Sequence, residues 1–172
     1  MRMSPTGIPL TPTLSPRRGS KEIHFRLIPI RKANFMEETF SIRPANADDL
    51  PNVLQFLQPF MDAQHILPRT SVELELLMRH SFIAESGGEV VGFAAIEVYS
   101  KKLAEVQCLA VSESHRRRGV GKQLVTRCVD RAKEEKVREV MAITATEGLF
   151  QDCGFDYALP GQKRALFVQS ND

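Results

Sequence analysis

Residues 109–125 have the pattern of an apolar strand that enters a basic, glycine-bearing turn and continues directly into an amphipathic helix. The turn reads Ser-Glu-Ser-His-Arg-Arg-Arg-Gly-Val-Gly-Lys over residues 112–122. The first N–H groups of a helix have no partners within the helix, and the helix dipole adds partial positive charge there. Glycine lets an anion approach the main chain closely. The run therefore predicts a strand–turn–helix unit that can hold a pyrophosphate mainly by main chain.

Two common phosphate-binding glycine motifs do not fit this turn. The chain has no GxxxxGK[ST] sequence and no GxGxxG sequence after a strand, which disfavours a nucleotide triphosphatase and a dinucleotide enzyme. Three arginines in a turn are also typical of a solvated surface loop. The turn alone leaves two interpretations open, an anion cradle and an exposed basic loop.

The chain after residue 36 alternates strand and helix patterns. Asn46 is placed to cap a first helix, and Gly87–Gly88 marks a hairpin turn. Thr70 and Glu73 have the spacing of a capping box for a second helix. The patterns predict strands at 40–44, 81–85, 90–99, 103–111, 137–144 and 164–169, and helices that begin near residues 46, 70, 121 and 147. We expect one α/β domain whose mixed sheet is covered by helices.

Charge divides the chain into a basic head and a mildly acidic body. Residues 1–35 hold seven of the 23 Lys and Arg residues, one of the 21 Asp and Glu residues and five of the ten prolines. This composition predicts disorder, with three explanations open: a flexible tail, an organelle-targeting peptide, or sequence upstream of a true start at Met36. Residues 36–172 hold the expected domain. The charge distribution gives no support for a nucleic-acid or membrane partner.

Hydropathy, cysteines and histidines limit where the protein can reside and whether it can bind a metal. No apolar run approaches the roughly 20 residues that span a bilayer, and the length of 172 residues suits one core. The three cysteines have no CxxC spacing, and the four histidines have no metal-binding or triad spacing. We therefore expect a reduced, cytoplasmic protein without a metal site. We expect His115 to lie on the loop surface beside the arginines, within reach of a phosphate.

Two motifs carry a resemblance to a known family. Arg116, Gly119 and Gly121 fit the pattern [R/Q]-x-x-G-x-[G/A] after an apolar strand, and Leu-Phe-Gln-Asp-Cys-Gly-Phe at 149–155 fits an aromatic-x-x-x-Gly-Phe turn. With these motifs and its element order, the sequence from about residue 40 to 168 resembles the GCN5-related N-acetyltransferases (GNAT). The resemblance implies a single GNAT-like α/β domain with a mixed, mostly antiparallel sheet flanked by helices. It also implies acetyl-CoA as the cosubstrate.

The resemblance assigns acetyl-CoA to the strand–turn–helix unit. It implies that the main chain of Leu109, Ala110 and Val111 pairs with the pantetheine arm. It implies that the pyrophosphate lies against the turn made by Arg116, Arg117, Arg118, Gly119, Val120, Gly121 and Lys122. Many relatives have a tyrosine in the second motif, which protonates the leaving thiolate of CoA. This chain has Phe150 at that place, so we assign no general acid.

Within the family, the chain is most similar to short amino-acid N-acetyltransferases of the N-acetylglutamate synthase type. Residues 65–74 and 102–111 carry this likeness. It implies that the acceptor is a small amino acid, L-glutamate first, acetylated by direct attack of its α-amine on the thioester, as in arginine biosynthesis. Carboxylates of an acidic substrate need fixed cations, and the candidates are Arg69, then Lys102 and Arg164.

The acceptor amine must lose a proton before it attacks, because a free amino acid's amine is largely ammonium near neutral pH. Glu105 matches the position of a glutamate that several relatives use, and either direct abstraction or a water relay would serve. Glu97 on the preceding strand is the reserve.

Other functions stay open from the sequence. One alternative keeps acetyl-CoA and changes the acceptor to a polyamine, an antibiotic or a protein N-terminus. Another is a regulatory acyl-CoA-binding module without turnover. A third is a nucleic-acid-binding role for the basic head, residues 1–35. The expected partner is a small-molecule amine, with no nucleic acid and no membrane. Dimers are common among relatives, and the sequence itself neither supports nor opposes a homodimer.

Overall fold

The computed structural model describes residues 39–157. The basic head and the strand predicted at 164–169 lie outside these residues. Within them, five strands form one sheet in chain order: β1 (Ser41–Pro44), β2 (Ser81–Ser86), β3 (Glu89–Val98), β4 (Leu103–Val111) and β5 (Glu139–Ala142). The pairs from β1 to β4 are antiparallel, and β4 and β5 are parallel. The prediction of a mixed, mostly antiparallel sheet is confirmed.

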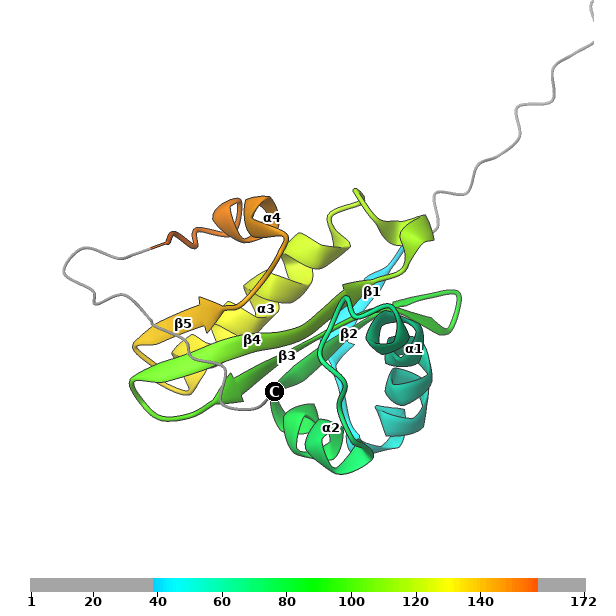
Figure 1. Ribbon diagram of the computed structural model, residues 1–172, viewed down its shortest axis with the longest axis horizontal. Helices are drawn as coiled ribbons and strands as arrows, with labels where there is room; N and C mark the ends of the chain where they lie inside the picture. The colour runs from blue at the N-terminus through cyan, green and yellow to red at the C-terminus, as the bar shows by residue number, and fades with distance from the viewer. Residues whose placement is uncertain (1–38, 158–172) are drawn as a thin grey trace, which may run out of the picture. The chain divides into compact units, whose positions relative to one another are not determined.

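Helices cover both faces of this sheet (Figure 1). One face packs against α1 (Leu50–Asp62) and α2 (Ser71–Leu77), and the other against α3 (Val120–Glu134) and α4 (Glu147–Gln151). Three short 3-10 helices join these elements: η1 (Ala47–Asp49), η2 (Met78–His80) and η3 (Glu113–His115). The alternation of side chains along β3 explains the two layers, because Phe93 and Ala95 pack with α1 and α2 while Ala94 and Ile96 pack toward α3.

The local signals in the sequence predict most element boundaries correctly. Asn46 and Thr70 both form capping boxes, the first with Asp49 at the start of η1 and the second with Glu73 in α2. Gly87 and Gly88 both have positive φ, as a tight hairpin turn requires. The strand predicted at 103–111 has the bounds of β4, whereas β5 is shorter than the predicted 137–144.

A glycine determines how closely α3 approaches the sheet. A Cβ at Gly92 of β3 would stand 3.0 Å from Val120 Cγ1 and 3.1 Å from Leu124 Cδ1 of α3, and 3.2 Å from Ala84 Cβ of β2. These separations are shorter than ordinary carbon contacts. Because Gly92 has no side chain, the first turns of α3 can lie directly on β2 and β3.

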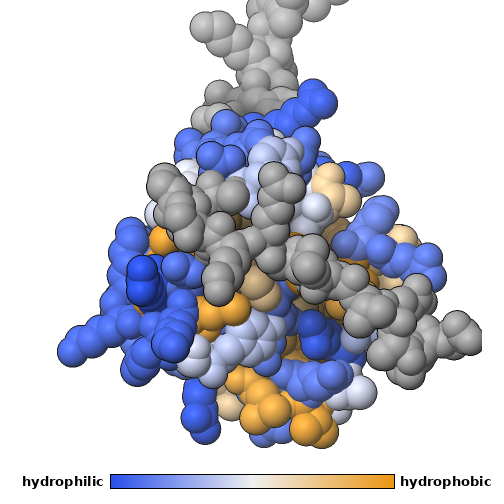
Figure 2. Space-filling model, turned by 60° about the vertical axis from the view of Figure 1, so that its left-hand side comes forward, coloured by the Kyte–Doolittle hydropathy of each residue, from blue (hydrophilic) through white to orange (hydrophobic). Residues whose placement is uncertain are grey.

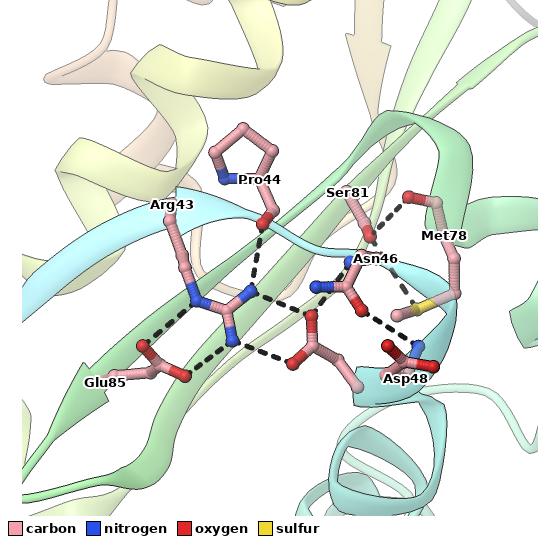
Figure 3. A network of polar contacts seen from close by, with 8 residues as sticks. Arg43, Pro44, Asn46, Asp48, Met78, Ser81 and Glu85 are labelled. Carbon is pink, nitrogen blue, oxygen red and sulfur yellow. Dashed lines mark hydrogen bonds and ion pairs between the residues drawn. The ribbon is translucent and has the colours of Figure 1, made fainter.

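An ion cluster joins β1, β2 and the segment before α1 (Figure 3). The Arg43 guanidinium donates hydrogen bonds to Asp49 at 2.7 and 2.8 Å and to Glu85 at 2.7 and 3.1 Å. Asp49 is buried and also accepts a hydrogen bond from the Asn46 N–H. The Arg43 hydrogen bonds hold the pKa of the Asp49 carboxyl below its ordinary value of 3.8. Charge therefore strengthens the attachment of β1, a strand of only four residues.

Acid is expected to weaken the fold through Asp49. A carboxyl whose pKa is lowered by folding stabilises the folded state above its unfolded pKa, here near 3.8, and the contribution is lost as pH falls through the folded pKa. We expect Asp49→Asn to lower the free energy of unfolding by about 1–2 kcal/mol at neutral pH and by much less well below pH 3.8. Urea unfolding at both pH values measures this, with the exposed Asp48→Asn as the control. An equal loss at both pH values would contradict the prediction.

Candidate active site

Strand β4 continues past the end of its parallel neighbour β5 (Figure 1). The last paired residues are Val106 and Ala142, where β5 ends, while β4 runs on to Val111. Residues 107–111 therefore have a main-chain edge that β5 does not cover. An uncovered strand edge offers N–H and C=O groups to an extended ligand. The predicted pantetheine contacts, Leu109, Ala110 and Val111, lie on this stretch.

A β-bulge lies in the same stretch of β4. Phe93 and Ala95 of β3 pair with Ala110 and Gln107 of β4, so β4 holds one extra residue between two pairs. Cys108 in the bulge has a φ of 54°. The extra residue returns Ala110 to the α1 and α2 face of the sheet. Bulges occur beside active sites because they redirect the main chain, and this one changes the direction of β4 at the start of its uncovered edge.

The turn after β4 ends at an N-terminus of α3 that no side chain caps. Gly119 precedes the helix with a φ of 84°, a conformation that favours glycine. The first N–H groups of this 15-residue helix therefore have no side-chain acceptor at the cap position, and the helix dipole adds positive charge. Arg116, Arg117 and Lys122 are exposed around them, and Arg118 is half-buried. The arrangement fits a pyrophosphate.

Two residues of the predicted cradle also serve in packing. The Val120 side chain is buried in the core, so only the main chain of this residue is available to a ligand. A Cβ at Gly121 would stand 3.2 Å from Leu149 Cδ2 of α4 and 3.7 Å from Val111 Cγ2. The first turn of α3 is thus packed closely against the end of β4 and against α4.

The prediction that His115 is a surface residue is wrong. Its side chain is buried, with Nδ1 3.0 Å from Ser112 Oγ and 2.9 Å from Ser114 Oγ. All three residues belong to the basic turn, so the imidazole helps to hold the turn's shape. The neighbouring arginines suggested exposure, whereas η3 turns His115 inward.

A carboxylate cluster lies on the α1 and α2 face, where Glu105 of β4 and Glu97 of β3 are cross-strand partners. Glu105 is buried, with 9% of its surface exposed. The Tyr99 hydroxyl donates to Glu105 Oε2 at 2.5 Å. The Gln107 amide nitrogen donates to Glu97 Oε2 at 2.5 Å and to the Tyr99 oxygen at 3.0 Å. The carboxylate predicted to be the base is therefore held in a hydrogen-bonded network.

The structure brings one of the three predicted substrate cations to this network. Arg69, just before α2, donates from Nη2 to Gln107 Oε1, and its Nη1 lies 3.8 Å from Glu73 Oε1. Lys102 is exposed in the β3–β4 turn, and its side chain forms no hydrogen bond or ion pair with any residue from 39 to 157. Arg164 lies outside the described residues.

An open pocket of about 300 Å³ adjoins the network between α2 and β3. Its lining includes two cationic side chains, two anionic side chains and one histidine: Arg69, Arg79, Glu73, Glu97 and His80. Apolar side chains of α2 and β3 complete the wall. A lining that carries both signs of charge suits a small zwitterion, such as a free amino acid.

Tyr99 and Gln107 are parts of this site that the sequence did not predict. Gln107 is two residues from Glu105, so strand alternation could have placed both side chains on one face. Tyr99 follows β3, and its N–H donates to the Leu103 carbonyl at 3.1 Å as the chain turns toward β4. Burial and the Glu105 hydrogen bond raise the pKa of Tyr99, so the phenol stays a donor at neutral pH.

The three cysteines and Phe150 lie in packed surroundings that do not suit a catalytic role. Burial raises the pKa of the Cys108, Cys128 and Cys153 thiols, which disfavours a thiolate nucleophile. Phe150 is buried edge-to-face against Phe155, with ring centroids 5.3 Å apart. Across residues 39–157 no group of His, Cys, Asp and Glu is placed to hold a metal ion. No helix in that range is long and apolar enough to cross a membrane.

An uncovered strand edge leads to a helix N-terminus that fits a pyrophosphate, and a buried carboxylate lies on the same strand. The fold and this geometry fit an acetyltransferase that takes acetyl-CoA as its acyl donor. Residues 50–155, more than half of the chain, match the acetyltransferase (GNAT) family, and the chain belongs to that family.

Relatives agree with this class. The chain is 32% identical over 114 residues to an uncharacterized N-acetyltransferase of Chlorobaculum tepidum, covering 66% of this chain and 74% of that protein. It is 30% identical over 135 residues to an amino-acid acetyltransferase of Pasteurella multocida, covering 75% and 31%. An N-acetylglutamate synthase from Neisseria gonorrhoeae, solved with coenzyme A and N-acetyl-glutamate, matches at a TM-score of 0.60 and 26% identity over 66% of this chain and 27% of that one. The chain spans less than a third of the last two proteins.

Proposed function

We propose that this acetyltransferase acetylates the α-amine of a small amino acid, with L-glutamate as the acceptor, in the cytoplasm and in arginine biosynthesis. The observation that carries the proposal is the contact of Arg69 with Gln107, which joins a guanidinium to the network around the buried Glu105. In this proposal a carboxylate-binding group, Arg69, and a proton acceptor, Glu105, belong to one site. Similarity to an amino-acid acetyltransferase and to an N-acetylglutamate synthase supports the choice of acceptor.

In this proposal the donor is held mainly by main chain. Leu109, Ala110 and Val111 offer the uncovered edge of β4 to the amides of the pantetheine arm. Residues 116–122 hold the pyrophosphate through the α3 N–H groups, with basic side chains around them. The acyl end of acetyl-CoA then lies along β4, toward Glu105.

Glu105 acts as the base. The acceptor arrives as an ammonium ion, and the carboxylates of Glu97 and Glu105 favour its binding. The amine nitrogen gives up two protons in the reaction: one passes through Glu105 to solvent, and one ends on the sulfur of CoA. The N–C bond forms at the thioester carbonyl carbon, and the C–S bond breaks. We assign no residue as the acid that protonates sulfur.

A second acceptor class is favoured by the local charge. Glu73 lies 3.8 Å from Arg69, and the carboxylates of Glu97 and Glu105 are linked to Arg69 through Gln107. An amino acid that carries a second amine would be attracted to this site, so L-2,4-diaminobutyrate and L-lysine belong in the substrate panel beside L-glutamate, L-glutamine and spermidine.

Arg69→Ala is expected to raise the KM for L-glutamate about tenfold or more while leaving the KM for acetyl-CoA unchanged, because a charge-assisted contact with the substrate carboxylate is lost. CoA release by the full-length chain measures both constants. Lys102→Ala, which removes an exposed cation of the β3–β4 turn, is the comparison. An unchanged KM for L-glutamate in Arg69→Ala would contradict the proposed acceptor site.

We also propose that residues 36–172 are the catalytic domain and that residues 1–35 take no part in the reaction. A chain that lacks residues 1–35 is then expected to keep the kcat and both KM values of the full chain. A fall in kcat on deletion would contradict this division.

A further inference from the structure

Tyr99 is a residue that the reaction scheme above does not use. It follows the last residue of β3, and about half of its surface is exposed. Its hydroxyl nevertheless reaches inward to the buried Glu105 Oε2, at 2.5 Å. Figure 2 shows one face of the molecule, on which hydrophilic residues cover much of the surface and hydrophobic residues form smaller patches between them. The Tyr99 ring is therefore half exposed, while its hydroxyl belongs to the buried network around Glu105.

Gln107 donates a hydrogen bond to the same Tyr99 hydroxyl. Its amide nitrogen donates to the Tyr99 oxygen at 3.0 Å, so that oxygen accepts one hydrogen bond and donates another. The Gln107 amide also bonds Glu97, and its carbonyl oxygen accepts from Arg69. The orientation of the amide is thereby fixed from both ends. Tyr99 has a single arrangement that satisfies this network, with its proton directed at Glu105.

The contacts of Glu105 are unequal for its two oxygens. Tyr99 at 2.5 Å and Gln107 at 3.4 Å both approach Oε2. Among the residues from 39 to 157, none donates a hydrogen bond to Oε1. One oxygen is therefore anchored by protein donors, and the other is left to accept a proton.

We propose that Tyr99 is a positioning residue, which holds the Glu105 carboxylate in one rotamer so that Oε1 faces the acceptor amine. This inference rests on the role of Glu105 in the proposed function. Tyr99 acts through Glu105 and does not touch the donor site on α3. Its loss therefore lowers kcat without changing the KM for acetyl-CoA.

A double-mutant cycle distinguishes this role from a structural one. We expect Tyr99→Phe to lower kcat about tenfold, because it removes one charge-assisted hydrogen bond and keeps the aromatic ring. In the Glu105→Gln background the same change is expected to have no further effect, since the group that Tyr99 positions is gone. The four proteins are compared by the rate of CoA release at saturating acceptor, together with the KM for acetyl-CoA.

The chain offers a matched control in its other described tyrosine. The Tyr157 hydroxyl also donates to a carboxylate, Glu147 Oε2, but both residues are exposed and lie near α4. Tyr157→Phe removes the same kind of bond and is expected to leave kcat unchanged. Thermal unfolding of each variant shows that a loss of rate is not a loss of fold.

Each result has a separate meaning. A tenfold loss that appears only when Glu105 is present supports the inference. An equal loss in both backgrounds, a matching loss in Tyr157→Phe, or no loss in Tyr99→Phe overturns it and leaves the role of Glu105 standing. Full activity in Glu105→Gln overturns both the assigned base and the role of Tyr99.

Discussion

Glu105→Gln is expected to lower kcat for acetyl transfer by about 10²–10⁴-fold, the range typical of a lost general base. The amide keeps the size and most of the packing of the buried carboxylate but cannot accept the proton of an ammonium ion. Because Glu105 faces the α1 and α2 side of the sheet and the donor contacts are main-chain groups of residues 109–111, the KM for acetyl-CoA is expected to stay unchanged. Initial rates of CoA release with saturating acceptor measure the effect.

Substitutions of two other glutamates serve as comparisons for the expected loss of kcat. Glu97→Gln alters the cross-strand partner and is expected to cost less, because the Glu97 contact with Gln107 lies one step from the base. Glu89→Gln alters an exposed residue at the β2–β3 hairpin and is expected to have no effect. If Glu105→Gln retained the wild-type kcat, or if Glu97→Gln cost more, the assignment of the base would be wrong.

Gly92→Val is expected to lower the free energy of unfolding by about 2–3 kcal/mol, as overpacked core substitutions do. Its Cβ alone would stand 3.0 to 3.2 Å from atoms of Val120, Leu124 and Ala84, so α3 must move away from the sheet. Val120 is the first residue of α3, so this movement displaces the N–H groups assigned to the pyrophosphate. We therefore expect a raised KM for acetyl-CoA as well as lower stability, measured by urea unfolding and by initial rates.

Gly148→Ala is the matched control for that change. Gly148 lies in the first turn of α4, and a Cβ there would meet no atom within 4 Å. Alanine is therefore expected to be neutral or to stabilise the fold by up to about 1 kcal/mol, because it lowers the entropy of the unfolded chain. If both variants lost the same stability, or if Gly92→Val bound acetyl-CoA normally, close packing at Gly92 would not position the helix.

Signals carried by neighbouring residues made most of the fold predictable. A capping box such as Thr70–Glu73 acts within four residues, and a pair of glycines such as Gly87–Gly88 defines its own turn. The basic turn before α3 was predicted for the same reason, since its strand, its glycines and its helix are contiguous in the chain.

Features that depend on distant contacts were not predictable in the same way. The bulge at Cys108 exists because β3 and β4 pair in two different registers, and cysteine gives no local sign of a positive φ. His115 is buried because η3 turns it under the arginine-rich turn. The contact of Tyr99 with Glu105 depends on how the β3–β4 turn folds. Glu105 was predicted from the sequence, but its hydrogen-bond partners could be identified only from the tertiary structure.

The acceptor proposed for this acetyltransferase is the α-amine of L-glutamate. The most direct measurement is a competition reaction in which the full-length chain receives isotope-labelled acetyl-CoA and an equimolar mixture of amino acids and simple amines, followed by mass spectrometry of the products. We predict that labelled N-acetyl-L-glutamate is the main product and that Glu105→Gln forms far less of it. Another acetylated amine as the main product would contradict the assigned acceptor, and no acetylated amine at all would contradict catalysis.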